Sequence, residues 1–291
     1  MAAHLRAATR RRSSWRAYGI NFDVQSISNQ EKIPMLEGKK IVVTGAASGI
    51  GAATAALAAA RGAHVLSVDI VRPTNSVGTF FQADLSSKTS IDQLIRSLPH
   101  EIDGLANIAG LPPTRPADEV VTVNLVGLKY LTQQLLPKFA DGASIVNLAS
   151  LAGLGWAEAK ETIDASAHID FADVQAFCHA YEIEGARSYS FSKEALIVWT
   201  MQNRWTWRAR GIRMNAVSPG PVDTPILKDF VATLGARVEE DMKTMDRPGT
   251  PGDIAPVVAF LLSDEAAWIR GTNIPTDGGM FSNVLCEKHD F

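Results

Sequence analysis

A glycine-rich turn between an apolar run and an alanine-rich segment constrains the fold of this chain more than any other feature. Residues 44–51 read Thr-Gly-Ala-Ala-Ser-Gly-Ile-Gly and directly follow Ile41-Val42-Val43. The alanine-rich stretch that follows predicts a helix ending at Gly62. Such a turn lets the backbone approach a pyrophosphate closely, and the first N–H groups of the helix point at that anion. The pattern predicts a dinucleotide-binding unit, whereas a plain strand-to-helix turn rarely needs more than one glycine.

The remainder of the chain alternates short β-branched runs with longer helical segments. This alternation is typical of a parallel sheet with helices on both faces. We therefore predict an α/β fold, a doubly wound parallel sheet of about seven strands in one domain spanning 35–291. Strands are expected at 41–43, 64–68, 80–81, 104–106, 144–148, 212–217 and 272–276, and later helices at about 88–98, 119–138, 188–209 and 252–262.

Charge and composition exclude several classes of protein. The net charge is −3, but residues 1–34 carry six basic and two acidic side chains, so the rest of the chain carries −3 − 4 = −7. That acidic balance disfavours nucleic acid as a main partner. No apolar stretch approaches the ~20 residues of a membrane span. The two cysteines have neither a disulfide framework nor metal-ligand spacing, which favours a reducing, cytoplasmic setting and predicts no metal site.

The segment 1–34 is expected to lie outside the domain. Residues 1–22 contain five arginines and no acid, and they have no long apolar run. We interpret 1–34 as a disordered basic tail or as sequence upstream of the natural start at Met35, and an organelle-targeting segment is the alternative.

The acid at position 69 predicts which coenzyme is bound. Asp69 lies 18 residues beyond Gly51, at the end of the second predicted strand. A carboxylate there accepts the hydroxyl groups of an adenosine ribose and repels a 2′-phosphate. The sequence thus favours NAD over NADP, although Arg72 follows three residues later.

A tyrosine and a lysine four residues apart predict acid–base chemistry. Tyr189 and Lys193 share one face of a predicted helix, so the ammonium can sit beside the phenol oxygen. A neighbouring cation is expected to lower the tyrosine pKa, which suits a group that moves a proton on and off an alcohol oxygen. Ser150, at the end of the strand 144–148, can hydrogen-bond the same oxygen. Alone, such a pair is usually part of an ordinary amphipathic helix.

Together these motifs resemble those of the short-chain dehydrogenase/reductase family over nearly all of 36–282. The resemblance implies a Rossmann-like fold and a catalytic tetrad of Ser150, Tyr189, Lys193 and Asn124, with Asn124 holding a water that relays protons to Lys193. It also implies contacts to the coenzyme from the glycine turn, from the loops after later strands and from the catalytic helix. The residues concerned are Gly45, Ser48, Gly49, Ile50, Gly51, Asp69, Asp84, Leu85, Asn107, Ala109, Gly110, Tyr189, Lys193, Pro219, Gly220, Val222 and Thr224.

Two departures from the usual family pattern narrow the resemblance. The segment between Gly110 and Asn124 is short, and Ser150 and Tyr189 are 39 residues apart. Both features resemble the bacterial 3α-hydroxysteroid dehydrogenase/carbonyl reductase branch, and 128–132 and 193–199 resemble coniferyl alcohol dehydrogenases. The resemblance implies NAD-dependent oxidation of an aromatic allylic alcohol such as coniferyl alcohol, with a hydroxysteroid as the alternative. A non-catalytic NAD-binding sensor or scaffold is the alternative of another class, and the intact serine, tyrosine and lysine argue against it.

The insertion at about 151–187 bears on assembly. It is expected to form an amphipathic helix pair that covers the helices at 119–138 and 188–209, with its acids turned to solvent. The alternative is a wall of the substrate pocket built from Trp156, Phe171, Phe177 and Tyr181. The apolar helix at 252–262 and the edge strand at 272–276 predict a homodimer interface, because both surfaces need a cover.

Overall fold

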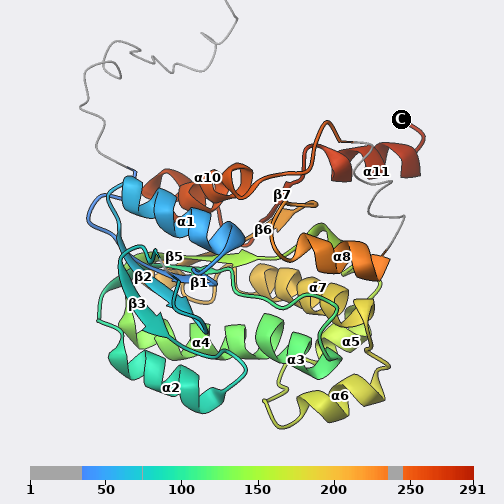
Figure 1. The fold of residues 1–291 in the computed structure, drawn as a ribbon, viewed down its shortest axis with the longest axis horizontal. Helices are drawn as coiled ribbons and strands as arrows, with labels where there is room; N and C mark the ends of the chain where they lie inside the picture. The colour runs from blue at the N-terminus through green and yellow to red at the C-terminus, as the bar shows by residue number, and fades with distance from the viewer. Residues whose placement is uncertain (1–34, 74, 235–244) are drawn as a thin grey trace, which may run out of the picture. The chain divides into compact units, whose positions relative to one another are not determined.

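The computed structural model describes residues 35–73, 75–234 and 245–291, so the predicted tail at 1–34 lies outside the described residues. The chain folds around a seven-stranded sheet in the order β3-β2-β1-β4-β5-β6-β7 (Figure 1). All six strand pairings are parallel, which confirms the predicted fold class. The strands are β1 Lys40–Thr44, β2 His64–Asp69, β3 Thr79–Gln82, β4 Ile102–Asn107, β5 Phe139–Leu148, β6 Arg213–Pro219 and β7 Asn273–Thr276.

Helices cover both faces of this sheet (Figure 1). α1 (Gly49–Ala60) and α10 (Pro251–Leu262) lie on one face. The other face is covered by α2 (Lys88–Ser97), α3 (Ala117–Val121), α4 (Leu128–Leu135) and α7 (Ala186–Gln202). The shorter helices α5 (Lys160–Ala165), α6 (Val174–Ala180), α8 (Leu227–Leu234) and α11 (Met280–Lys288) lie outside these layers.

Alternate residues of the central strands point to opposite faces of the sheet. In β1, Ile41 and Val43 pack with α1 and α10, whereas Val42 packs on the side of α2 and α4. Because both faces are covered, the strand has no polar side, which explains its continuous apolar run. Among the described residues, no helix has the length and apolar character that a bilayer crossing requires.

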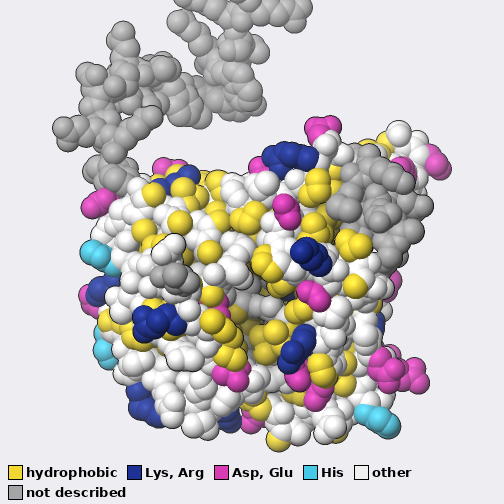
Figure 2. Space-filling model, in the orientation of Figure 1, with side chains coloured by type: hydrophobic (Ala, Val, Ile, Leu, Met, Phe, Trp, Pro, Cys, Tyr) yellow, Lys and Arg dark blue, Asp and Glu magenta, His cyan; other side chains and the backbone are white. Residues whose placement is uncertain are grey.

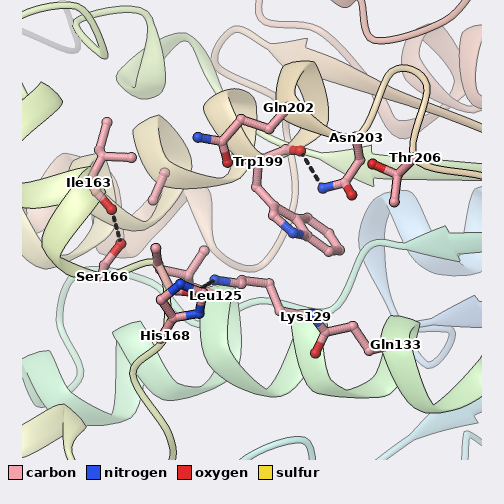
Figure 3. A pocket seen from close by; sticks show the side chains of 12 residues that line it. Leu125, Lys129, Gln133, Ile163, Ser166, His168, Trp199, Gln202, Asn203 and Thr206 are labelled. Carbon is pink, nitrogen blue, oxygen red and sulfur yellow. Dashed lines mark hydrogen bonds between the residues drawn. The ribbon is translucent and has the colours of Figure 1, made fainter.

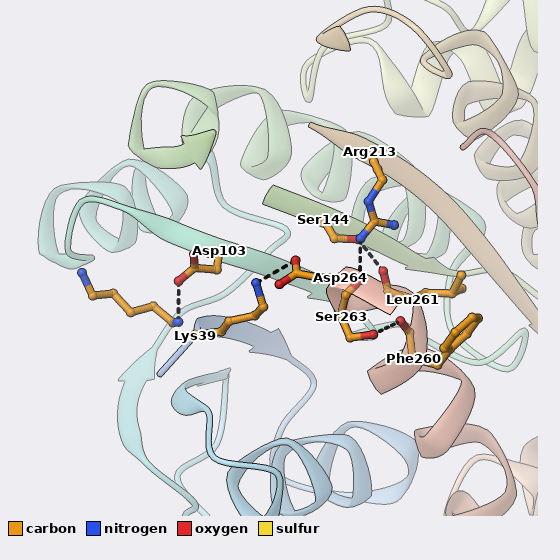
Figure 4. Close-up of polar contacts among 9 residues, drawn as sticks. Lys39, Asp103, Ser144, Arg213, Phe260, Leu261, Ser263 and Asp264 are labelled. Atoms are coloured by element: carbon orange, nitrogen blue, oxygen red, sulfur yellow. Dashed lines mark hydrogen bonds and ion pairs between the residues drawn. The ribbon is translucent and has the colours of Figure 1, made fainter. Parts of the chain in front are cut away.

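Buried polar side chains hold the end of α10 against the sheet (Figure 4). Arg213 donates to the backbone oxygen of Ser263 at 2.9 Å, and the Ser144 hydroxyl donates to that of Leu261 at 2.7 Å. The last carbonyl groups of a helix have no partner within the helix. These side chains therefore satisfy groups that burial would otherwise leave unpaired, and Arg213 also faces the negative end of the helix dipole.

Two predicted helices differ from the structure. The helix expected at 119–138 is interrupted by a π-helical turn at Thr122–Gly127. The helix expected at 188–209 ends at Gln202, because the Asn203 side chain donates to the backbone oxygen of Trp199 at 2.8 Å and closes the last turn. Helices α8 and α11 were not predicted.

The insertion at 151–187 packs on the helices beside it. Ile163 of α5 and Phe177 of α6 form one apolar cluster with Leu125 of the π-helical turn and Phe191 of α7. The seven acidic side chains of the insertion are all exposed. This arrangement agrees with the covering role. Of the aromatic residues in the alternative pocket wall, Phe177 packs on Phe191, with ring centroids 5.5 Å apart.

Candidate functional site

A cavity of about 270 Å³ opens at the carboxyl ends of the central strands. The strand order reverses between β1 and β4, and ligands of open α/β sheets bind at such a point. Figure 2 shows a hollow near the centre of this face, bordered by hydrophobic side chains. The cavity's lining includes eleven predicted coenzyme residues: Gly45, Ser48, Gly49, Ile50, Gly51, Asp69, Asp84, Leu85, Ala109, Gly110 and Thr224.

The glycine turn is shaped by contacts that exclude side chains. A Cβ atom at Gly51 would lie 2.0 Å from the backbone oxygen of Gly45, which no side chain can tolerate. Gly45 has φ +70°, and a Cβ there would lie 2.9 Å from the backbone of Ala109. The turn between β1 and α1 is thus packed against the loop after β4, with bare backbone lining the cavity.

The first turn of α1 presents backbone donors at this cavity. Ser48 is the N-cap residue in an extended conformation, and its side chain makes no capping hydrogen bond. The first N–H groups of α1 therefore remain available to a ligand, and the positive end of the helix dipole lies there. A cradle that a Cβ atom would fill, beside free helix N–H groups, fits the pyrophosphate of a dinucleotide.

Asp69 holds the turn from the end of β2. Its carboxylate accepts hydrogen bonds from the backbone N–H of Ala47 at 2.9 Å and of Val71 at 3.1 Å. Arg72 lies with its guanidinium over the Phe80 ring, 4.6 Å from the centroid. The structure therefore brings the acid, and not the arginine, to the cavity lining.

Four predicted coenzyme residues lie behind the cavity. The Asn107 side chain is 1% exposed and donates to Thr132 and Asn147, each at 2.9 Å, so it braces β4 against its neighbours, and the coenzyme contact predicted for this residue remains a prediction. Pro219 and Val222 are buried. Gly220 packs against Asp277, 3.1 Å from a Cβ built on it. Thr224 lines the cavity, and its hydroxyl donates to the backbone oxygen of Val222 at 3.3 Å.

Three of the four predicted catalytic side chains come together beside α7. Ser150 ends the segment after β5 and caps the 3₁₀ turn Leu151–Gly153, which packs against the α7 backbone at Lys193. The Ser150 hydroxyl lies close enough to the phenol of Tyr189 to lower its pKa. The Lys193 ammonium donates to the backbone oxygen of Leu148 at 2.7 Å and lies 5.4 Å from the centre of the Tyr189 ring.

Asn124 lies in the π-helical turn between α3 and α4 and is fully buried. Its amide oxygen accepts from the backbone N–H of Leu111 at 2.7 Å, and its nitrogen donates to the backbone oxygen of Leu111 at 3.0 Å. A Cβ atom on Gly110 would lie 3.3 Å from the Asn124 oxygen and 3.8 Å from the Lys193 nitrogen. The Asn124 side chain therefore fixes the loop after β4, and the water-holding role predicted for this residue remains a prediction.

The pKa prediction for the tyrosine is wrong in its sign. Burial raises the pKa of Tyr189 to about 12, although the hydrogen bond with Ser150 acts in the opposite direction. Burial also lowers the pKa of Lys193 to about 8. The lysine does not overcome burial because its ammonium lies over the ring and is itself removed from water, with a neutral carbonyl as its partner.

The site is covered by a further helix, α8, which was not predicted from the sequence. Phe230 of α8 packs edge-on against Tyr189, with ring centroids 4.7 Å apart. On the same helix Asp229 accepts a hydrogen bond from Thr114 at 2.9 Å, which ties α8 to the loop after β4. The apolar spacing of Leu227, Phe230, Val231 and Leu234 in the sequence is the signal from which α8 could have been found.

Comparison with known proteins connects this geometry to a family. A family model described as short chain dehydrogenase matches residues 39–161. A second model, described as enoyl-(acyl carrier protein) reductase, matches residues 171–281.

The alignments with similar proteins extend over almost the full length of those proteins. The chain is 43% identical over 253 residues to coniferyl-alcohol dehydrogenase of Pseudomonas sp. (strain HR199 / DSM 7063), which covers 86% of this chain and 99% of that protein. It is 31% identical over 255 residues to 3-alpha-hydroxysteroid dehydrogenase/carbonyl reductase of Comamonas testosteroni, covering 82% and 95%. The solved structure of 3-alpha-hydroxysteroid dehydrogenase from Pseudomonas sp. B-0831 complexed with NADH superposes with a TM-score of 0.76 at 29% identity, covering 84% and 98%.

Proposed function

The chain belongs to the short-chain dehydrogenase/reductase family, and on this premise we propose that it is an NAD-dependent dehydrogenase of aromatic allylic alcohols such as coniferyl alcohol. The observation that carries the proposal is the meeting of Ser150, Tyr189 and Lys193 beside a cavity that fits a dinucleotide. The 43% identity to coniferyl-alcohol dehydrogenase over 99% of that protein supports the substrate class.

The three side chains suit removal of a proton from an alcohol. The Ser150 hydroxyl and the Tyr189 oxygen hold the substrate oxygen between them, and the ionised tyrosine accepts the hydroxyl proton. The ammonium of Lys193 stabilises the phenolate while that proton is absent. When bound, the coenzyme supplies the acceptor for the hydride that leaves the substrate carbon. The alcohol thus loses one proton and one hydride and becomes the carbonyl product.

The coenzyme we propose is NAD. Asp69 lines the cavity at the end of β2, where a carboxylate binds ribose hydroxyl groups and repels a phosphate. The position of Arg72 supports this choice, because its guanidinium lies over Phe80 and the residue is not part of the cavity lining.

The proposal is tested with a panel of alcohols and purified protein, measured by NADH absorbance. We expect coniferyl alcohol to give the highest kcat/KM, and Tyr189→Phe to reduce kcat below a few per cent while NADH affinity stays within about twofold. A hydroxysteroid is the second candidate, supported by the 31% identity to the Comamonas testosteroni enzyme. Turnover of neither class, with retained NADH binding, would favour the non-catalytic sensor or scaffold.

We also propose that the protein is a homodimer through α10 and β7. β7 is the last strand of the sheet, so one of its edges is open, and Trp268 beside it is 97% exposed. The insertion occupies the outer face of α7, which leaves α10 and β7 for a two-fold contact. Light scattering on protein lacking 1–34 measures the outcome: a tetramer contradicts the covering role of the insertion, and a monomer contradicts the interface.

A further inference from the structure

A second cavity lies on the side of α4 and α7 that faces away from the coenzyme site. Its volume is about 460 Å³, within the range of small-molecule sites, and its lining shares no residue with the first cavity. Figure 3 shows the side chains converging from three segments: α4 below, the insertion at the left, and the end of α7 above. The insertion is thus one wall of this cavity.

The lining is rich in hydrogen-bond donors, and none of the described residues that form it is a carboxylate. Lys129 supplies an ammonium, His168 an imidazole, and Gln133 and Gln202 supply amides. The Lys129 nitrogen donates to the backbone oxygen of Ala167 at 3.0 Å, and no carboxylate pairs with it among the described residues. Burial lowers the pKa of the half-buried Lys129, whose ammonium has a neutral carbonyl as its hydrogen-bond partner. An anion in the cavity would stabilise the ammonium through a charge-assisted hydrogen bond.

The rest of the lining combines polar side chains, Ser166, Asn203 and Thr206, with an apolar part built around Trp199. The Trp199 indole projects from α7 between Lys129 and Gln133 on one side and Gln202 on the other (Figure 3). Leu125, Ile163 and Ala195 add aliphatic surface. A ligand that satisfies both halves of this lining carries one anionic group and a planar apolar body.

We propose that this cavity is a binding site for a small aromatic carboxylate, with the carboxylate on Lys129 and the ring beside Trp199. The site is independent of the proposed dehydrogenase activity, since none of its lining residues belongs to the coenzyme cavity or to the catalytic group. Leu125 directly follows Asn124, and Ala195 lies two residues after Lys193, so the ligand would rest on the helices that carry both residues.

The experiment is isothermal titration calorimetry of the full chain with trans-cinnamate and with its neutral analogue trans-cinnamamide. We expect one cinnamate site per chain and at least tenfold weaker binding of the amide. Lys129→Met should weaken cinnamate binding at least tenfold, and Gln202→Trp, which fills the cavity from its exposed rim, should abolish it. Lys288→Met removes an exposed lysine of α11 and should leave the affinity unchanged.

Three results would overturn the proposal. One is unchanged cinnamate affinity in Lys129→Met and Gln202→Trp, with both proteins melting within a few degrees of the parent. Another is displacement of cinnamate by coniferyl alcohol together with its loss in Tyr189→Phe, which would place the ligand in the active site. The third is a change in the number of subunits in Gln202→Trp, which would identify this face as a contact between copies of the chain.

Discussion

Replacing Gly153 by alanine should disable turnover while leaving the coenzyme site intact. Gly153 ends the 3₁₀ turn that Ser150 caps, and a Cβ atom on it would lie 2.6 Å from the backbone carbon of Lys193. Ordinary contact begins at 3.4 Å, so the turn must retreat from α7 by at least 0.8 Å. The atoms it would meet are backbone atoms within a helix, so they cannot yield as a flexible side chain would.

That displacement acts directly on the reacting group. Ser150 faces the Tyr189 phenol across the boundary between the turn and α7, and the retreat carries Ser150 away from that phenol. A misplacement of about 1 Å typically costs on the order of 100-fold in rate. We therefore expect kcat to fall roughly 100-fold. Gly153 is absent from the lining of the coenzyme cavity, so NADH affinity should stay within about twofold.

Steady-state kinetics at saturating NAD and alcohol, with NADH binding followed by fluorescence, measures both quantities. Gly155→Ala is the matched control in the same loop, because its Cβ would meet the Glu194 oxygen at an ordinary 3.4 Å. This control should retain most of the activity. If Gly153→Ala kept a third of the parent rate while its fold was intact, the close packing of the turn on α7 would not position Ser150.

Three further outcomes follow from the same geometry. Asp69→Ala should reduce the ratio of NAD to NADP efficiency at least tenfold, because charged hydrogen bonds to the ribose are each worth roughly 1.5–3 kcal/mol; an unchanged ratio of kcat/KM values would contradict the coenzyme assignment. Burial lowers the Lys193 pKa from 10.5 to about 8, so between these values the unfolded chain holds a proton that the folded protein has released. Below pH 8 the buried ammonium therefore destabilises the folded protein fully, and this cost falls as the pH rises and the ammonium loses its proton. In denaturant titrations, the free energy of unfolding of the parent relative to Lys193→Met should increase by about 1 kcal/mol per pH unit from 8 to 10. Phe230→Ala exposes Tyr189 to water and should lower the pKa of the tyrosine from about 12 toward 10, measured as phenolate absorbance. An unchanged pKa would show that other residues, and not Phe230, bury the phenol.

The coenzyme half of the site could be predicted from the sequence because it depends on local backbone chemistry. Gly45 and Gly51 are required by contacts between β1, α1 and the loop after β4, and those segments adjoin the turn in every sheet of this kind. The fold could be predicted for a similar reason. Each buried parallel strand has a continuous apolar run, so it can be recognised from its own local sequence.

The cover over the catalytic residues could not be predicted, because it depends on segments that meet only in three dimensions. Phe230 reaches Tyr189 from α8, 41 residues further along the chain, through a contact that no spacing rule connects. The side chain of Asn107 is another example: its position after β4 matches the family pattern, but only the structure shows that the side chain turns inward to Thr132 and Asn147. Which way a side chain leaves the end of a strand depends on the neighbours on either side of it.

The pKa values of Tyr189 and Lys193 also depend partly on local sequence and partly on three-dimensional packing. The spacing of four residues correctly predicts a shared helix face, but the sign of each pKa shift depends on how much water reaches the pair. Removal from water disfavours both charged forms, so it raises the tyrosine pKa and lowers that of the lysine. The resting pair therefore holds the proton on the phenol at neutral pH, which suits an acid that protonates a carbonyl. The proposed alcohol oxidation needs the phenolate, and the Ser150 hydroxyl lowers the pKa of Tyr189 in that direction. A nearby ammonium also favours a phenolate, and the Lys193 nitrogen lies 5.4 Å from the ring centre. In the proposed reaction, the close packing of the Ser150 turn against α7 therefore supports oxidation by holding that hydroxyl at the phenol.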